Sequence, residues 1–386
     1  MEAGVVPFGL LFSVAGPYAA VSQAMLNGAM LAVNEVNARQ DDGMRLEPVA
    51  ANPAGRLDRY APLCAALLQQ GIRHVVGCYT SSSRKEVIPL FERADALLWY
   101  PSHYEGFESS AHVIYTGAVA NQHVLPLADY MLRRCGGRAF CVGSNYIWAW
   151  ENNRILRERL ASAGGGVVAE RCFAVGETDF AQVIDAIIAA RPDFVFNTLI
   201  GVSSYQFLAD FRARCAARGI DQAREIPVAS CTLSEPELEA IGPEAADGHI
   251  TASVYFSSIR TSANDRFVAE YGARYPEGPS ACADAEAAYI AVRLLAAALT
   301  EAGATANTEA IKRAVTQRGV DAPQGPVRIS SETFHAALTP RIARSTKAMR
   351  FEILAEAPAP VEADPYLVWN SSRFSAQTMP ALRVAS

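Results

Sequence analysis

The sequence predicts an α/β protein with two lobes, each built on a doubly wound parallel sheet. The first evidence is a continuous apolar run at Val6–Phe12 (VPFGLLF), which is typical of a strand buried on both faces of a parallel sheet. The second is the helical spacing of apolar residues over Val21–Asn37. The third is that this rhythm restarts after a break near Gly117–Gln122, in a chain of 386 residues that is too long for one ordinary domain.

The other elements continue the alternation of strand and helix. Before the break, strands are expected at Arg73–Cys78 and Ala96–Trp99. Such alternation implies a parallel sheet with helices on both faces, so two series imply two lobes. The second series comprises strands at Ala139–Gly143, Asp193–Thr198 and Ile226–Cys231, and helices at Asn153–Ala163, Phe180–Ala190 and Ser203–Arg218.

The C-terminal part of the chain is arranged differently. Helical spacing predicts helices at Ser262–Tyr275, Ala283–Ala302 and Asn307–Gln317. After a Pro/Gly turn the chain favours strands, most clearly at Met349–Leu354 and Tyr366–Trp369.

Composition excludes several classes of partner. The formal net charge of -6 gives no electrostatic reason to expect direct nucleic-acid binding. We see no apolar run long enough to span a bilayer. The eight cysteines are dispersed without CxxC spacing, which favours buried free thiols and a reducing compartment. The N-terminus has no signal-peptide pattern, so we expect a cytoplasmic protein, or a periplasmic one if a leader was removed.

Motifs for cofactors, metals and catalysis are absent from the sequence. There is no P-loop, no GxGxxG and no HxxxH, so no cofactor and no metal are expected. Cys78 ends an apolar strand, which favours an inert thiol over a nucleophile. Glu105 and His103 could act as a general base, but no activated nucleophile accompanies them. We therefore expect no enzymatic activity, with an amidase as the alternative.

Polar and aromatic residues follow four expected strands, at the sheet edge where open parallel sheets bind ligands. Ser83 and Glu86 have capping-box spacing, which would place Ser81 near a helix N-terminus. Ser234 and Glu237 have the same spacing. For Ser83 and Ser234, it is equally expected that the side chain serves only as a helix cap. The four loops are Tyr79–Glu86, Tyr100–Phe107, Ser144–Trp150 and Thr232–Ser234.

These loops combine hydroxyl groups and aromatic rings with few formal charges. Such a lining suits a small, neutral, polar ligand and suits a phosphate or a metal poorly. The sequence therefore predicts a binding protein for a small uncharged molecule.

Two of these loops carry a family resemblance. The runs Gly77–Lys85 (GCYTSSSRK) and Tyr100–Glu108 (YPSHYEGFE) resemble those of the amide sensors of bacterial aliphatic-amidase operons. They are also similar to the urea and short-chain-amide binding proteins of ABC transporters, within the leucine-binding-protein group. Further matches are Gly9–Ser13, Gly143–Ile147, Tyr255–Ser258, Ala285–Tyr289, Asp321–Arg328 and Asp364–Tyr366.

The resemblance implies the periplasmic-binding-protein type 1 fold, with two lobes joined by a three-crossover hinge. The crossovers are expected near Gly117–Gln122, Tyr255–Ser258 and Ala322–Val327. This would give an N-terminal lobe of residues 1–118 plus 257–324 and a C-terminal lobe of residues 119–256 plus 325–386. It also implies a ligand in the interlobe cleft and signalling by hinge closure.

By resemblance, the site draws on all four loops. Ser102, His103 and Trp148 depart from the sensor's pattern, which leaves the identity of the amide open. The expected ligand-binding residues are Tyr79, Ser81, Tyr100, Ser102, His103, Tyr104, Tyr146, Trp148 and Thr232.

The resemblance also implies a function. Tyr79 and the segment Tyr104–Glu108 favour the sensor, a negative regulator of an amidase operon that holds an RNA-binding antiterminator until an amide arrives. The alternative is a receptor that delivers urea or short-chain amides to an ABC permease. A homo-oligomer is left open.

Overall fold

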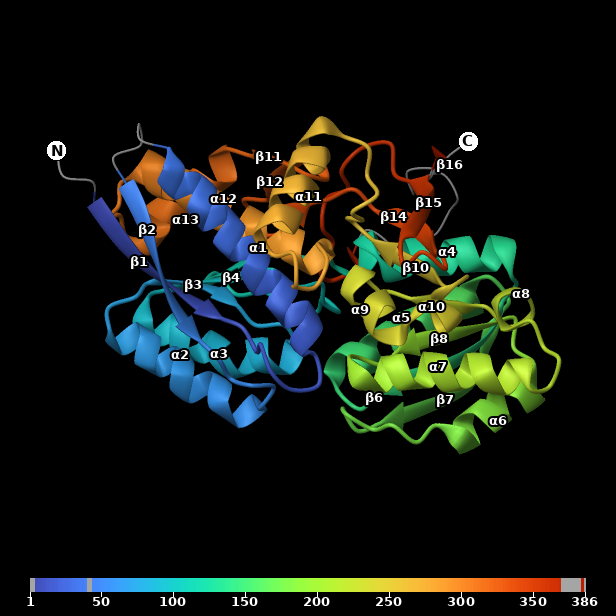
Figure 1. Ribbon diagram of the computed structural model, residues 1–386. Helices are drawn as coiled ribbons and strands as arrows, with labels where there is room; N and C mark the ends of the chain where they lie inside the picture. The colour runs from blue at the N-terminus through green and yellow to red at the C-terminus, as the bar shows by residue number, and fades with distance from the viewer. Residues whose placement is uncertain (1–3, 40–43, 369–382, 385–386) are drawn as a thin grey trace. The chain divides into compact units, whose positions relative to one another are not determined.

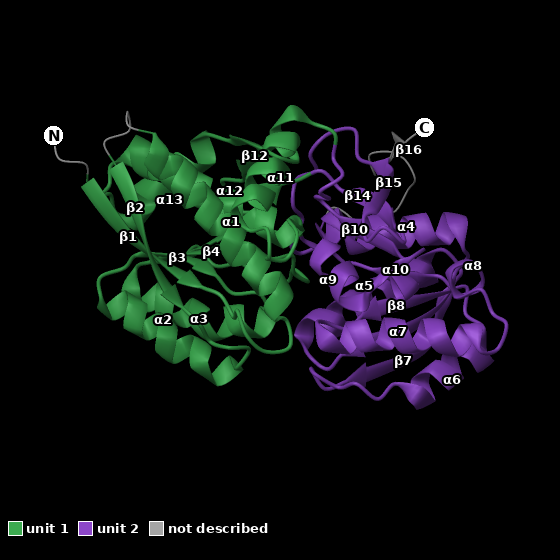
Figure 2. Cartoon of the chain, in the orientation of Figure 1, with its two compact units in different colours: residues 1–118, 260–338 green, residues 119–259, 339–386 purple. Residues whose placement is uncertain are grey.

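The computed structural model describes residues 4–39 and 44–368 and the backbone of residues 383–384 (Figure 1). The chain divides into two compact units (Figure 2). Unit 1 contains Met1–Ala118 and Arg260–Leu338, and unit 2 contains Val119–Ile259 and Thr339–Ser386. The chain therefore passes between the units three times. In the described part of the chain, no helix is long and apolar enough to cross a membrane.

Residues 325–338, which were expected in the C-terminal lobe, belong to unit 1, and residues 257–259, which were expected in the N-terminal lobe, belong to unit 2. Residues 325–338 form part of a three-stranded antiparallel sheet in the order β11 (Val320–Ala322), β12 (Gly325–Ile329) and β13 (Ala336–Ala337). A crossing at residue 324 would cut the β11–β12 hairpin, so the chain leaves unit 1 only after this sheet is complete.

Unit 1 is built on a five-stranded parallel sheet in the order β2-β1-β3-β4-β5. Helices α2 and α3 lie on one face, and α1 and α12 lie on the other (Figure 1). The strands are β1 (Gly4–Leu11), β2 (Met44–Ala51), β3 (His74–Gly77), β4 (Leu97–Tyr100) and β5 (Val113–Tyr115). The helices are α1 (Ala19–Ala38), α2 (Tyr60–Gln69), α3 (Ser81–Ala94), α11 (Ser262–Arg274), α12 (Ala283–Ala302) and α13 (Thr308–Gln317), with a 3-10 turn at Leu57–Arg59.

Helices α1 and α12 are in close contact, and a glycine permits it. A Cβ atom at Gly28 would lie 2.1 Å from the carbonyl oxygen of Ala285. The approach of the two backbones therefore requires glycine at this position.

Unit 2 is built on an eight-stranded mixed sheet in the order β16-β15-β14-β10-β9-β8-β6-β7. Strands β6 to β10 are parallel, and β14 to β16 extend that sheet with antiparallel pairing. The strands are β6 (Arg138–Ser144), β7 (Gly166–Phe173), β8 (Phe194–Thr198), β9 (Val228–Ser230), β10 (Ile250–Ser253), β14 (Arg341–Ser345), β15 (Phe351–Glu356) and β16 (Arg383–Val384).

The helices of unit 2 form pairs that cover its sheet. Helix α4 contacts α5, and α7 contacts α6, α9 and α10. They are α4 (Val124–Arg134), α5 (Ile147–Ser162), α6 (Ala181–Ala190), α7 (Val202–Ala216), α8 (Gln222–Glu225), α9 (Glu235–Ile241) and α10 (Pro243–Ala246), with a 3-10 turn at Ala120–Gln122.

Two expected elements differ from the structure. Helix α5 begins at Ile147 and not at Asn153, because the aromatic residues that follow β6 continue into its first turn. The strand expected at Tyr366–Trp369 is not found in residues 366–368. Tyr366 lies in a turn, in which the Leu367 amide donates to the carbonyl oxygen of Asp364. Trp369 lies outside the described residues.

Candidate functional site

The loop after β3 turns sharply into helix α3. Cys78 adopts a left-handed backbone conformation with φ of 66°, and its amide donates to the carbonyl oxygen of Leu11 at 3.0 Å. Burial raises the pKa of the Cys78 thiol far above its usual range. The thiol is therefore neutral and inert, as a structural cysteine is.

Thr80, and not Ser83, is the N-cap of α3. The Thr80 hydroxyl accepts from the Ser83 amide at 3.2 Å, and the Ser83 hydroxyl donates to the Thr80 carbonyl oxygen at 2.7 Å. The capping box predicted for Ser83 and Glu86 is therefore wrong by three residues. The Thr80 hydroxyl satisfies one of the amides of the first turn, and the helix begins at Ser81.

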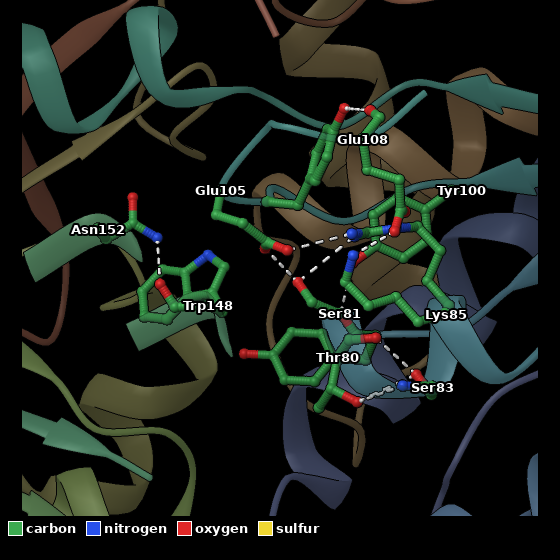
Figure 3. Close-up of polar contacts among 12 residues, drawn as sticks. Thr80, Ser81, Ser83, Lys85, Tyr100, Glu105, Glu108, Trp148 and Asn152 are labelled. Atoms are coloured by element: carbon green, nitrogen blue, oxygen red, sulfur yellow. Dashed lines mark hydrogen bonds and ion pairs between the residues drawn. The ribbon is translucent and has the colours of Figure 1, made fainter. Parts of the chain in front are cut away.

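Ser81 is the first residue of α3 and its side chain faces a buried carboxylate (Figure 3). Its hydroxyl donates to Glu105 in a short hydrogen bond, and it accepts from Nη1 of Arg84 at 3.4 Å. Ser81 is 2% exposed. Its hydroxyl is thus engaged within unit 1.

Arg84 is fully buried and carries two ion pairs. It lies 3.2 Å from Glu105 and 2.7 Å from Glu108, and Lys85 also pairs with Glu108. Burial alone would raise the pKa of Glu108, but Arg84 and Lys85 outweigh burial and lower that pKa. The charge of Arg84 is therefore balanced inside the unit, as a buried guanidinium requires.

The loop after β4 is tied to two other parts of unit 1. The Tyr100 hydroxyl donates to the carbonyl oxygen of Tyr79 at 2.8 Å. Ser102 donates to Asp284 at 3.2 Å, and Nδ1 of His103 lies 3.4 Å from the same carboxylate. Asp284 lies in the first turn of α12, where a carboxylate is favoured by the helix dipole. Acidic residues are common at the start of helices, so Asp284 could not be singled out as a site residue from the sequence.

The rings of Tyr79 and His103 lie in one aromatic group. The Tyr79 ring centroid is 5.2 Å from that of Tyr18 and 6.5 Å from that of His103. The side chain of His103 is 14% exposed, and Tyr79 is buried. The pair forms an aromatic wall beside the helix N-terminus of α3.

Tyr104 belongs to the core of unit 1. It is fully buried, and its ring stacks on that of Tyr115 at 5.1 Å and lies under the guanidinium of Arg84 at 4.3 Å. Its hydroxyl lies 2.5 Å from Nε2 of His335 and donates to the carbonyl oxygen of Glu108 at 2.9 Å. These contacts support the Arg84 network from beneath.

The expected residues of unit 2 follow β6 and β9. Tyr146 occupies the N-cap position of α5 and lies 6.3 Å from Trp148, ring to ring. Trp148 is 2% exposed, and its carbonyl oxygen accepts from the side-chain amide of Asn152 at 2.7 Å (Figure 3). Thr232 is buried, and its amide donates to Ser230 Oγ at 3.1 Å.

Helix α9 carries the second capping box, which is confirmed for Ser234 and Glu237. Glu235 lies between them in the first turn of α9 and was not among the residues expected at the site. It is 3% exposed, and its Oε1 accepts from the Ser257 amide at 2.7 Å. Its Oε2 has no hydrogen-bond partner in the described part of the chain. Burial raises the pKa of Glu235 to about 7.

The expected site residues thus fall into two sets. Unit 1 brings together Tyr79, Ser81, Tyr100, Ser102 and His103 at the ends of the adjacent strands β3 and β4, with Tyr104 beneath them. Unit 2 carries Tyr146, Trp148 and Thr232 at the ends of β6 and β9. Across residues 4–39 and 44–368, no group of three or more His, Cys, Asp or Glu side chains is placed to hold a metal ion.

Known proteins show the same fold. A family model described as "Periplasmic binding protein domain" matches residues 6–372. A solute-binding protein of an ABC transporter from R. palustris, in complex with benzoate, is similar with a TM-score of 0.82 and 21% identity, over 94% of this chain and 98% of that chain.

Two more solved structures are similar. One is a solute-binding protein from Rhodopseudomonas palustris HaA2 in complex with p-hydroxybenzoic acid, with a TM-score of 0.85 and 19% identity over 95% of this chain and 100% of that chain. The other is the branched-chain amino acid transporter substrate binding protein LivJ from Streptococcus pneumoniae in complex with isoleucine. Its TM-score is 0.79 and its identity 20%, over 91% of this chain and 98% of that chain. At such identities the likeness shows the fold alone.

Proposed function

This chain belongs to the periplasmic binding protein family, and from that premise we propose that it binds a small uncharged amide or urea. The similar proteins are solute-binding proteins and not enzymes, which agrees with the prediction of no enzymatic activity.

The observation that supports a neutral ligand is the balanced charge of Arg84. A benzoate-like or amino-acid carboxylate needs a buried counter-charge, because a desolvated anion without one is costly. Arg84 lies beside the expected site residues at the ends of β3 and β4, and its guanidinium already binds Glu105 and Glu108. Nδ1 of His103 lies 3.4 Å from the carboxylate of Asp284. This set offers no unbalanced cation to a carboxylate.

The polar groups of this set suit an amide. The first turn of α3 carries backbone N–H groups at its N-terminus, which favour a carbonyl oxygen. Asp284 and the hydroxyl of Ser102 are acceptors for the N–H groups of an amide or urea. The ring of Tyr79 provides an apolar wall for a short alkyl group.

Calorimetry tests the ligand. We expect heat from acetamide or urea and none from benzoate or isoleucine at matched concentration. For four heavy atoms the ceiling is about 6 kcal/mol, or a dissociation constant of tens of micromolar. Tighter binding of benzoate or isoleucine than of any simple amide would contradict the proposal. Asp284→Asn should weaken amide binding, while Asp265→Asn on the outside of α11 serves as its control.

For the role of the chain, we propose a receptor that delivers the ligand to an ABC permease, from outside the cytoplasmic membrane. The solute-binding descriptions of the similar structures support this role. They lend no support to the cytoplasmic location expected from the sequence. Ligand-dependent closure of the two units would signal the loaded state, and a pair of distance labels, one per unit, would detect it.

The regulator role is a second candidate, carried by Tyr79 and the segment Tyr104–Glu108. The two roles differ in the effect of deleting the gene. Loss of uptake of labelled urea or acetamide indicates the receptor. Constitutive amidase expression with unchanged uptake indicates the regulator and its antiterminator partner.

A further inference from the structure

Tyr18 lies in the loop after β1 and is not one of the groups proposed to contact the ligand. It occupies the N-cap position of α1 without making a side-chain cap, and it is 4% exposed. Its hydroxyl lies among those of Tyr60, Ser13 and Thr80, which oppose the rise in its pKa that burial causes. Ser13 and Tyr60 are themselves joined by a hydrogen bond of 2.8 Å. The Tyr18 side chain is therefore held where the loops after β1 and β3 meet the start of α2.

The ring of Tyr18 lies against the ring of Tyr79. Their centroids are 5.2 Å apart with an interplanar angle of 39°, and both side chains are buried. The Tyr79 ring has a second aromatic neighbour in His103, at 6.5 Å and 81°. The ring proposed as the wall for an alkyl group thus has neighbours that restrict its position.

The backbone around Tyr79 is fixed. The Cys78 amide donates to a carbonyl oxygen of β1 at 3.0 Å, and the carbonyl oxygen of Tyr79 accepts from the Tyr100 hydroxyl at 2.8 Å. The next residue, Thr80, is the N-cap of α3. With its backbone held, the Tyr79 ring can move only by changing its side-chain rotamer. Such a change needs free space beside the ring, and Tyr18 fills part of that space.

We propose that Tyr18 is a positioning residue that limits the size of the ligand, because its ring keeps that of Tyr79 in place. The site then takes amides with a short alkyl group and excludes amides that carry a ring. The inference rests on the proposed function and specifies the class of amide. Loss of a buried ring leaves a cavity that the surroundings fill only in part. Without the Tyr18 ring, Tyr79 would withdraw into this cavity and vacate a space of about the size of a ring.

Calorimetry with acetamide and benzamide tests the inference, because both are uncharged amides and they differ in the size of the apolar group. We expect the native chain to bind acetamide more tightly than benzamide. Tyr18→Ala should raise the ratio of benzamide affinity to acetamide affinity by about tenfold or more, the scale on which apolar pockets discriminate by size. Tyr18→Leu, which keeps a buried apolar side chain, should change this ratio in the same direction, and it decides the question if Tyr18→Ala does not fold. Tyr18→Phe keeps the ring and should leave the ratio unchanged.

Tyr271→Ala separates this role from a general loss of packing. Tyr271 is a buried tyrosine of α11 whose ring lies beside those of Phe267 and Tyr275. Its substitution should lower the melting temperature and leave the affinity ratio as it is in the native chain.

Three results would overturn the inference. They are equal native affinity for benzamide and acetamide, an unchanged ratio in the Tyr18→Ala and Tyr18→Leu variants that fold, and an equal change of the ratio in Tyr18→Phe or Tyr271→Ala. In each of these cases amides still bind, so the proposed function stands. The absence of heat from any amide or urea with the native chain would overturn the proposed function and this inference with it.

Discussion

Glu235 provides a test of how burial governs the electrostatics of unit 2. The change is Glu235→Gln, which keeps a side-chain oxygen able to accept from the Ser257 amide and removes the titrating group. The pKa of Glu235 is raised by burial to about 7, from a reference value of 4.5. The folded state therefore binds a proton that the unfolded state has released between these two pH values.

The sign and size of the effect follow from this difference. A carboxyl with a raised pKa costs no stability below pH 4.5, and stability falls as the pH rises to about 7. A difference of about 2.5 pKa units corresponds to about 3 kcal/mol. We expect the free energy of unfolding of Glu235→Gln, relative to the native chain, to rise by up to about 3 kcal/mol from pH 4.5 to pH 8.

Thermal unfolding at a series of pH values measures this difference. Burial lowers the pKa of His249 and of His74 to about 4, so both favour folding as the pH rises, but they are present in both proteins and cancel in the difference. Glu244→Gln, exposed on the neighbouring helix α10, is the matched control and should show a constant difference. A constant difference for Glu235→Gln as well would refute the reasoning.

Three further predictions concern stability, each measured by thermal unfolding. Thr80→Ala should cost about 1 kcal/mol, because it removes the N-cap of α3; an unchanged midpoint would contradict that role. Arg84→Met should cost about 3–5 kcal/mol, because Glu105 and Glu108 are left without their buried partner; Lys85→Met, at an exposed pair, should cost less than about 1 kcal/mol. Gly28→Ala should cost about 1–3 kcal/mol through its clash with α12, whereas Gly272→Ala, in open space on α11, should gain up to about 1 kcal/mol.

The sequence was sufficient for features set by neighbouring residues. Apolar runs and helical spacing located most of the strands and helices, and α12 begins and ends as expected at Ala283 and Ala302. The capping box of Ser234 and Glu237 was also predicted correctly, because it depends on residues three apart. The misplaced cap of α3 shows the limit of such local rules, since Thr80 and Ser83 both carry a hydroxyl group and only the path of the loop decides between them.

The tertiary structure decided which polar groups meet. Ser81 and Glu105 are 24 residues apart, and Ser102 and Asp284 are 182 residues apart. The sequence placed Ser81 correctly at a helix N-terminus, but it could not show that the hydroxyl would be engaged by a buried carboxylate. Helical and strand periodicity act over a few residues, whereas the burial of a charge and its balancing partner depend on how distant segments pack.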